Sequence, residues 1–464
     1  MPESVDDLLR EAVAHHQAGR LAEARTLYEG VLRLDEANPN ALNLLGMVHH
    51  AQERNEHAAE LIARAIEAAP SVAGFHNNLG TVRLAQRRPV EAEACFRKAL
   101  EIEPQYVEAI NNLGVALLGQ GKMDEAIPHF LRAIELRHAY PSTRNNLGNA
   151  LRAKRMYREA INCYRDALAF KPDHHESWSN LAIALLESKD LAGAEAACKR
   201  AIELKPDAID PIYTLGLTLE EAGRIDEALE QYRAALKLRP RARGLRFQLA
   251  SLTGEQTFAA APPEYVASLF DNYADTFDRH LVKTLNYRGP QLLHEAVLAA
   301  GITGPINIAD LGCGTGLCGV LFKPMARTLV GVDLSSRMVH QARERGVYNE
   351  LFVEEVTGFL AARPSQFDLL VAADVLIYFG DLSGLLAAAS QALRPGGTMA
   401  FTLERHDGSG YVLHPTRRYA HSIEYVRSLL AEAKLREVSA REAVLRTQRR
   451  QDVVGWVVVL KQEM

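Results

Sequence analysis

The stretch that decides the fold of the C-terminal half is residues 306–316, INIADLGCGTG. An apolar run that ends in closely spaced glycines is typical of a buried parallel strand turning into a helix. Glycines let a ligand lie against the backbone at such a turn, and the first N–H groups of the next helix remain free to bind it. We therefore predict a ligand site here. Its candidate residues are Asp310, Gly312, Cys313, Gly314 and Gly316.

A second acidic residue lies where a nucleotide ribose would be bound. The apolar run 328–332 ends at Asp333, which is 21 residues beyond Gly312. In nucleotide-binding α/β folds an acidic side chain at about this distance reaches the ribose hydroxyls. We expect Asp333 and the adjoining Leu334 to contact the nucleoside part of the ligand.

The rest of this half alternates strands with helices. Further short apolar runs lie at 351–353, 367–372 and 399–403, and helical stretches separate them. Near the C-terminus, REVSAREAVLRTQ and DVVGWVVVLK are typical of two adjacent strands joined by a polar turn. The pattern predicts a Rossmann-like α/β domain over 262–464, with a parallel sheet and an antiparallel C-terminal hairpin. A proline pair at 262–263 marks its start.

Two ligand classes fit the glycine-rich turn. Gly314, Gly316 and Gly319 match the dinucleotide fingerprint GxGxxG, so a nicotinamide dinucleotide is the alternative. The carboxylate of Asp310 at the strand end favours a ligand that carries an ammonium group, as the methionine part of S-adenosylmethionine does. Only about 150 residues follow the motif, too few for a usual separate catalytic domain. We therefore predict S-adenosylmethionine as the cofactor.

The N-terminal half repeats itself every 34 residues. In each unit a bulky residue such as Phe96 usually follows four positions after a recurring alanine such as Ala92. Small residues let two helices approach closely, a large one fills the groove of its neighbour, and prolines end the units. The period predicts an all-α solenoid of about seven repeats over 1–240, followed by a capping helix and linker over 241–261. The recurring alanines are Ala24, Ala58, Ala92, Ala126, Ala160, Ala194 and Ala228.

Asparagines recur at the same period, just before the leucine of each Leu-Gly pair. They are Asn78, Asn112, Asn146 and Asn180. Asparagine is a poor helix former, and the core does not require it at this position. One interpretation is a local side-chain bond at a helix start, repeated by duplication. The other, which we favour, is a ladder of amides along the concave surface, each able to bind one peptide unit of an extended chain.

These patterns resemble two known families. Residues 1–240 are similar to tetratricopeptide repeats, and the asparagine series is similar to that in the superhelix of O-linked N-acetylglucosamine transferase. Residues 262–464 resemble class I S-adenosylmethionine-dependent methyltransferases. The resemblance implies a donor site in which Glu355 and Val356 lie at the adenine and Asp374 closes the fourth strand. It also implies the roles given above to Asp310, the motif glycines and Asp333.

A more specific likeness is to predicted methyltransferases that carry tetratricopeptide repeats. It rests on LFDNYADTFDRHLVKTLNYRGPQLL, VAADVLIYFGDL and YVLHPTRRYAHSIEYVRSLL. The domain is also similar to the biotin-pathway malonyl-carrier methyltransferases, in which an N-terminal FDxYAxxFDxH helix covers the donor. This resemblance implies that Tyr273 and His280 form a lid over the cofactor. Aromatic packing of an amphipathic helix is the alternative for Tyr273.

The acceptor side of the site is less clearly marked. The sequence DVLIY at 374–378 replaces the (N/D)PP(Y/F) motif, which argues against methylation of nucleobase amino groups. Tyr378 and His421 are the catalytic candidates. His421 has the ordinary pKa of a general base, but it equally suits the start of the following helix. Arg417 and Arg418 could bind an acceptor carboxylate.

The overall composition excludes several partners. With 53 basic and 58 acidic residues the chain has a formal net charge of −5, so we expect no nucleic-acid partner. Its five cysteines form no CxxC and its histidines form no HExxH, so we expect no metal. We find neither a signal peptide nor an apolar run long enough to span a bilayer, which predicts a cytoplasmic protein without a membrane partner.

Two function classes remain open at this stage. The first is an enzyme that methylates a protein or peptide held in the groove of its own repeats. The second is a binding scaffold whose methyltransferase fold senses the donor or acts on a small molecule. The intact Asp310, motif glycines and Asp333 favour an active enzyme. A long repeat array favours a macromolecular partner over a metabolite.

Overall fold

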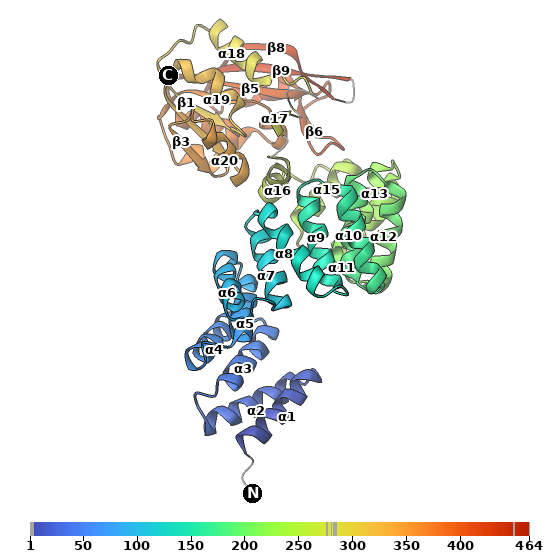
Figure 1. Ribbon diagram of the computed structural model, residues 1–464. Coiled ribbons are helices and arrows are strands. Elements are labelled where there is room, and N and C mark those ends of the chain that lie inside the picture. The colour runs from blue at the N-terminus through green and yellow to red at the C-terminus, as the bar shows by residue number, and fades with distance from the viewer. Residues whose placement is uncertain (1–3, 275–276, 280, 282–284, 449–450, 464) are drawn as a thin grey trace. The chain divides into compact units, whose positions relative to one another are not determined.

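The computed structural model describes residues 4–274, 277–279, 281, 285–448 and 451–463 (Figure 1). The chain divides into two compact units, Met1–Gln231 and Tyr232–Met464. The described residues of the first form helices joined by turns, and the second is built around a sheet. The fold class predicted from the sequence is confirmed: a helical solenoid is followed by an α/β domain with an antiparallel C-terminal hairpin.

The repeats consist of helix pairs in which a 13-residue helix precedes a 14-residue helix. Successive first helices, such as α5, α7 and α9, contact one another along the array. The helices are α1 (Val5–Gln17), α2 (Leu21–Leu34), α3 (Pro39–Ala51), α4 (Asn55–Ala68), α5 (Ala73–Ala85), α6 (Pro89–Ile102), α7 (Val107–Gly119), α8 (Met123–Leu136), α9 (Pro141–Ala153), α10 (Tyr157–Phe170), α11 (His175–Glu187), α12 (Leu191–Leu204), α13 (Ile209–Glu221) and α14 (Ile225–Leu238).

Small residues in the first helix receive large ones from the second, as the sequence predicted. A Cβ at Gly80 would lie 2.5 Å from the ring of Phe96, and a Cβ at Gly148 would lie 2.5 Å from the ring of Tyr164. Both rings are fully buried. The glycines therefore allow the two helices of a repeat to pack closely, and a larger residue would force them apart.

The turn between the two helices of a repeat needs one residue in the left-handed conformation. Positive φ angles recur there at the period of the repeat. They belong to Gly19, Glu53, Arg87, Gly121, Arg155, Lys189 and Gly223. Glycine adopts this conformation without strain, whereas the charged residues do so at a cost of about 1 kcal/mol each. The period is thus visible in the backbone as well as in the core.

The second unit is a mixed sheet flanked by helices. Its helices are α15 (Arg243–Thr253), α16 (Pro263–Tyr273), α17 (Phe277–Arg279), α18 (Gly289–Ala299), α19 (Leu317–Phe322), α20 (Ser336–Glu344), α21 (Val356–Ala361), α22 (Ser383–Ala392) and α23 (Ile423–Leu430), with 3-10 turns η3 (Lys323–Met325) and η4 (Leu376–Tyr378). Its strands are β1 (Ile306–Leu311), β2 (Ala326–Asp333), β3 (Glu350–Val353), β4 (Phe367–Ala372), β5 (Leu393–Arg405), β6 (Tyr411–Leu413), β7 (Tyr419–His421), β8 (Leu435–Gln448) and β9 (Gln451–Gln462).

The strand order through the described residues is β3-β2-β1-β4-β5-β7-β6, with β9 also paired to β5 and β8 to β9. The pairs from β3 to β5 are parallel, whereas β5–β9 and β8–β9 are antiparallel. The short strands β6 and β7 were not predicted from the sequence. His421, for which a helix start was one interpretation, lies in β7, and the helix begins at Ile423.

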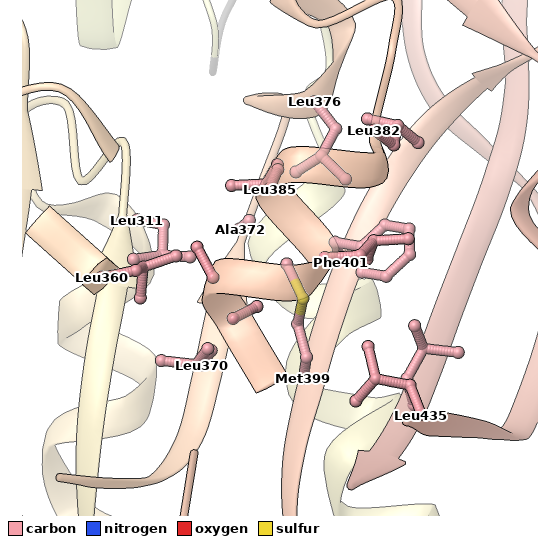
Figure 2. Close-up of a cluster of buried hydrophobic side chains, with 14 of the residues drawn as sticks. Leu311, Leu360, Leu370, Ala372, Leu376, Leu382, Leu385, Met399, Phe401 and Leu435 are labelled. Carbon is pink, nitrogen blue, oxygen red and sulfur yellow. The ribbon is translucent and has the colours of Figure 1, made fainter. Parts of the chain in front are cut away.

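The sheet is buried on both faces, as expected for parallel strands. Along β4, Leu370 and Ala372 pack on one side, whereas Leu369 and Val371 pack on the other. Figure 2 shows the first cluster, in which strand residues such as Phe401 meet residues of α21 and α22. Burial on both sides fixes the strand register and therefore the positions of the residues at the strand ends.

Candidate active site

The glycine-rich turn follows the carboxyl end of β1. Gly312, Gly314 and Gly316 have φ angles of 62°, 53° and 93°, which favour glycine at each position. A Cβ at Gly312 would also collide with the side chain of Val375. Cys313 is buried, and its N–H donates to the carbonyl of Val332, so the turn is tied to β2.

Asp310 is a buried carboxyl group at the end of β1. Its side chain is 1% exposed, and the hydroxyl of Tyr348 donates a 2.6 Å hydrogen bond to Oδ2. Burial raises the pKa of Asp310 to about 7, although the Tyr348 bond opposes this shift. An ammonium group placed here would favour the ionised carboxylate. The site is therefore suited to a cationic ligand.

Asp333 links the end of β2 to the turn. Its carboxylate accepts hydrogen bonds from the N–H groups of Gly314 and Ser335, both at 2.9 Å. Burial raises its pKa, and these backbone bonds act in the opposite direction. The adjoining Leu334 packs against a cluster that contains Tyr378. Asp310, the three glycines and Asp333 are thus brought together at the carboxyl ends of β1 and β2.

Two further candidates lie just beyond the carboxyl end of β3. Glu355 follows β3 and caps α21, because its Oε2 accepts a 2.9 Å bond from the N–H of Gly358. Val356 begins that helix and is buried. These contacts fix the backbone at the position where the resemblance places the adenine.

Helices α16 and α17 are joined to this site by two aspartates that sequence reasoning did not assign. Oδ1 of Asp271 accepts from the hydroxyl of Ser335 at 2.6 Å and from the N–H of Arg337 at 3.3 Å. Asp278 bonds to the hydroxyl of Thr315 in the glycine-rich turn and to the guanidinium of Arg345. Both aspartates belong to the FDxYAxxFDxH pattern, so a signal for them was present.

Aromatic residues complete this covering segment. The ring of Phe277 lies 3.6 Å from the position of a Cβ on Gly314, and Tyr273 packs edge-on against Phe277 at 5.3 Å between ring centroids. This placement is compatible with the lid that the sequence predicts. His280, the other predicted lid residue, lies outside the described residues.

The end of β4 carries a charged network. Asp374 has a φ of 57°, and its carboxylate accepts a 2.6 Å bond from Arg446 of β8. Arg446 also pairs with Glu404, and its side chain is only 1% exposed. Arg418 lies 3.7 Å from the same glutamate. Arg446 is another residue that sequence reasoning missed, since nothing local distinguishes it from other strand arginines.

The two catalytic candidates occupy different environments. Tyr378 is 9% exposed in η4, and its ring packs edge-on against Phe270. His421 is fully buried, its Nε2–H donates to the carbonyl of Gly380 at 3.1 Å, and burial lowers its pKa to about 4. A neutral imidazole with one nitrogen engaged in this way suits packing rather than proton transfer. We therefore leave His421 out of the proposed chemistry.

A cavity of about 360 Å³ lies at the other end of the strands from the glycine-rich turn. Asn307, Thr328, Phe367 and Arg394 line it at the amino ends of the strands. Ligands of open α/β sheets bind beyond the carboxyl ends of the strands, so we place the site at the glycine-rich turn and not in this cavity. Across the described ranges, no three His, Cys, Asp or Glu side chains form a group that could hold a metal ion.

The recurring asparagines of the first unit form bonds between repeats. Each donates through Nδ2 to Oδ1 of an asparagine 35 residues earlier, at 3.0 or 3.1 Å. We call these donors the outer row (Asn78, Asn112, Asn146 and Asn180) and their acceptors the inner row (Asn43, Asn77, Asn111 and Asn145). The inner row is buried and the outer row is half-buried.

The alternative of helix-start chemistry is wrong for this series. Asn78 lies in the middle of α5, which begins at Ala73 after Val72, and no side chain caps that helix. Asn112 is likewise inside α7, which begins at Val107. The asparagines therefore line up along the first helices of the repeats, which contact one another along the array.

Comparison with known proteins supports the family resemblance predicted for each half of the chain. Residues 309–401 match the methyltransferase domain family, and tetratricopeptide-repeat families match 9–73, 71–137, 105–173, 145–209 and 210–242. The chain joins tetratricopeptide repeats to a methyltransferase domain. The resemblance inferred from the sequence is thereby confirmed.

Individual relatives cover only parts of the chain. A ubiquinone biosynthesis O-methyltransferase from Thiobacillus denitrificans is 29% identical over 23% of this chain and 48% of its own length. A malonyl-[acyl-carrier protein] O-methyltransferase from Pseudescherichia vulneris is 27% identical over 37% of this chain and 66% of its own length. A solved tetratricopeptide-repeat protein from Parabacteroides merdae is 15% identical, with a TM-score of 0.45, over 54% of this chain and 98% of that one. The chain thus spans less than two thirds of these two methyltransferases.

Among the described residues, no helix is both long and apolar enough to cross a membrane.

Proposed function

We propose that this protein transfers a methyl group from S-adenosylmethionine to a protein or peptide held by its repeats. The observation that carries the proposal is Asp310. It is a buried carboxyl group beside a glycine-rich turn, and its neighbour Tyr348 is a neutral hydroxyl donor. A ligand with an ammonium group supplies the missing charge, and a pyrophosphate would be repelled by the carboxylate.

The other residues of the site fit the same cofactor. Asp333 would bind the ribose, Glu355 and Val356 would contact the adenine, and the backbone of the glycine-rich turn would lie against the bound ligand. Asp271 and Asp278 join α16 and α17 to this turn, so Tyr273 and Phe277 would exclude water from the donor. The cofactor supplies an activated methyl group bonded to a positively charged sulfur.

The protein's contribution to this chemistry is alignment and a dry pocket. The residues of the site would hold the acceptor atom on the side of the methyl carbon opposite the sulfur, where the cofactor would supply its methyl group by displacement. Asp374 and Glu404 are both engaged by Arg446, which holds them in fixed positions at the end of the sheet. Tyr378 follows the same strand end as Asp374 and would contact the acceptor.

The geometry of the two asparagine rows supports an extended polypeptide as the acceptor. The bond to the inner row uses one N–H of each outer amide and fixes its orientation. In Asn78, Asn146 and Asn180 the bond to the inner row is made by Nδ2, so it does not use Oδ1. A fixed amide that still offers an acceptor and a donor can pair with a peptide unit at little further entropic cost.

A second candidate is a small-molecule methyltransferase whose repeats serve assembly. It is favoured by the names of the relatives, which act in ubiquinone biosynthesis and on malonyl-[acyl-carrier protein]. The two proposals differ in what the repeats do for catalysis.

Labelling of a cell extract separates them. The full chain is incubated with the extract and S-adenosylmethionine labelled in the methyl group, and label in protein is compared with label in small molecules. We expect label in protein, and its loss when all four outer-row asparagines become alanine. Asn162→Ala, an exposed asparagine in the second helix α10, is the matched control. Label confined to small molecules would favour the second candidate.

A further inference from the structure

A short segment before the methyltransferase fold is bonded to the loop after β4. We call Phe258–Ala261 the strap and residues 376–381 the η4 loop. The N–H of Ala261 donates to the carbonyl of Tyr378, and the N–H groups of Gly380 and Asp381 both donate to the carbonyl of Ala259, all at 2.8 Å. Ala260 forms an antiparallel bridge with Phe379. The strap therefore acts as a short extra strand for this loop.

Side chains reinforce the backbone bonds. The hydroxyl of Tyr419 in β7 donates to the carbonyl of Phe258 at 2.9 Å. Phe247 of α15 is fully buried, and its ring lies 5.5 Å from Phe258 and 6.2 Å from Tyr419. Helix α15, which the sequence predicted as a cap for the last repeat, thus shares a core with β7 and η4.

The η4 loop is held from its other side as well. His421 donates to the carbonyl of Gly380, and a Cβ at Gly380 would lie 2.6 Å from the ring of Tyr419. Tyr378 and Ile377 are buried in the same cluster as Phe247 and Ala261. The loop that carries Tyr378 is therefore held between β7 and the strap, and its position depends on contacts with both.

We infer that the strap and α15 form a positioning element for the acceptor side of the active site. They hold Tyr378 in place. The donor side touches the same cluster through Leu334, but it has further connections of its own through Asp271 and Asp278. The inference rests on the proposed function only in assigning Tyr378 to the acceptor side. The segment that connects the repeats to the methyltransferase fold would therefore have a direct role in the catalytic unit.

The test is hydrogen exchange of the full chain with S-adenosylmethionine bound. Tyr419→Phe removes the bond to Phe258, and Phe247→Leu perturbs the cluster from outside the methyltransferase fold. For Tyr419→Phe we expect exchange in 376–381 to accelerate about two- to tenfold, the effect of one lost hydrogen bond, and for Phe247→Leu we expect a change in the same direction. Exchange in the turn 312–316 and the donor Kd should stay within twofold of the parent, while label transfer to extract proteins falls.

Tyr411→Phe is the matched control, because it removes a hydroxyl from the same aromatic cluster but leaves the Phe258 bond. Unaltered exchange of 376–381 in both strap variants would overturn the inference. So would equal acceleration at 312–316 with a matching loss of donor affinity, because that would indicate general loosening. A parent protein that does not bind the donor would instead refute the proposed function.

Discussion

Nδ2 of Asn112 donates a hydrogen bond to Oδ1 of Asn77 in the preceding repeat, at a distance of 3.1 Å. Equivalent bonds run from Asn146 to Asn111 and from Asn180 to Asn145. The ladder predicted as a binding surface is therefore also a contact between repeats. Oδ1 of Asn111 accepts a second bond from the buried hydroxyl of Thr143 at 3.0 Å, which makes this residue a junction of two repeats.

Replacing Asn111 with alanine should destabilise the array by about 1–3 kcal/mol, because the donors of Thr143 and Asn146 lose their acceptor. Urea unfolding followed by circular dichroism measures the change. Asn162→Ala, at an exposed site, should stay within about 0.5 kcal/mol of the parent. Equal stability of the Asn111 variant would mean that the inner row contributes little to the packing of repeats.

The turns between paired helices offer a stabilising change. Arg87 is exposed and has a φ of 59°, so glycine should relieve strain and raise stability by about 0.5–1 kcal/mol. Gly121 occupies the equivalent turn with a φ of 76°, and Gly121→Ala should lower stability by about 1 kcal/mol. The urea midpoints of the two variants should therefore move in opposite directions. A decrease for Arg87→Gly would contradict the strain argument.

Arg446 should be essential to the second unit. Arg446→Met removes the buried guanidinium that pairs with the half-buried carboxylates of Asp374 and Glu404 and leaves only Arg418 near Glu404, which should cost about 3 kcal/mol. Adding Asp374→Asn and Glu404→Gln should recover part of the loss. The unfolding transition of the second unit is identified by its shift with S-adenosylmethionine. Unchanged stability of the single variant would show that this charged network contributes little to the stability of the second unit.

Donor affinity should depend on pH through Asp310. Burial raises its pKa to about 7 in the unliganded protein, and the ammonium group must bind the ionised form. Below pH 7 a proton must leave before the donor binds, so affinity should fall by up to about tenfold per pH unit. Above pH 7 this dependence should level off. Calorimetry between pH 5.5 and 7.5 measures the slope, and Asp310→Asn should abolish it.

Much of the fold follows from local patterns. The 34-residue period predicts the helix pairs, and the run into Gly312 predicts the strand and turn, because small residues and glycines allow close packing and positive φ where larger residues would not. The strands β6 and β7 were missed because three-residue strands leave little periodicity. Their pairing with each other and with β5 is set by tertiary contacts.

The position of a candidate site residue could be predicted where it follows from the local sequence, but not where two residues far apart in the chain must meet. Asp310 and Asp333 are placed by the strands that precede them. Arg446 acquires its role only because β8 brings it to Asp374, 72 residues earlier in the chain. His421 was a reasonable base by its ordinary pKa, but the sheet buries it and directs its Nε2–H to a carbonyl.

The central claim is that the turn at Gly312–Gly316 binds S-adenosylmethionine through Asp310. Calorimetric titration of the full chain tests it, with Asp368→Asn as a control at the opposite end of the sheet. The parent and the control should bind alike, and Asp310→Ala should bind about ten- to a hundredfold more weakly, as expected for a lost charge-assisted bond. Equal binding by Asp310→Ala and the parent, or tighter binding of a nicotinamide dinucleotide, would contradict the account.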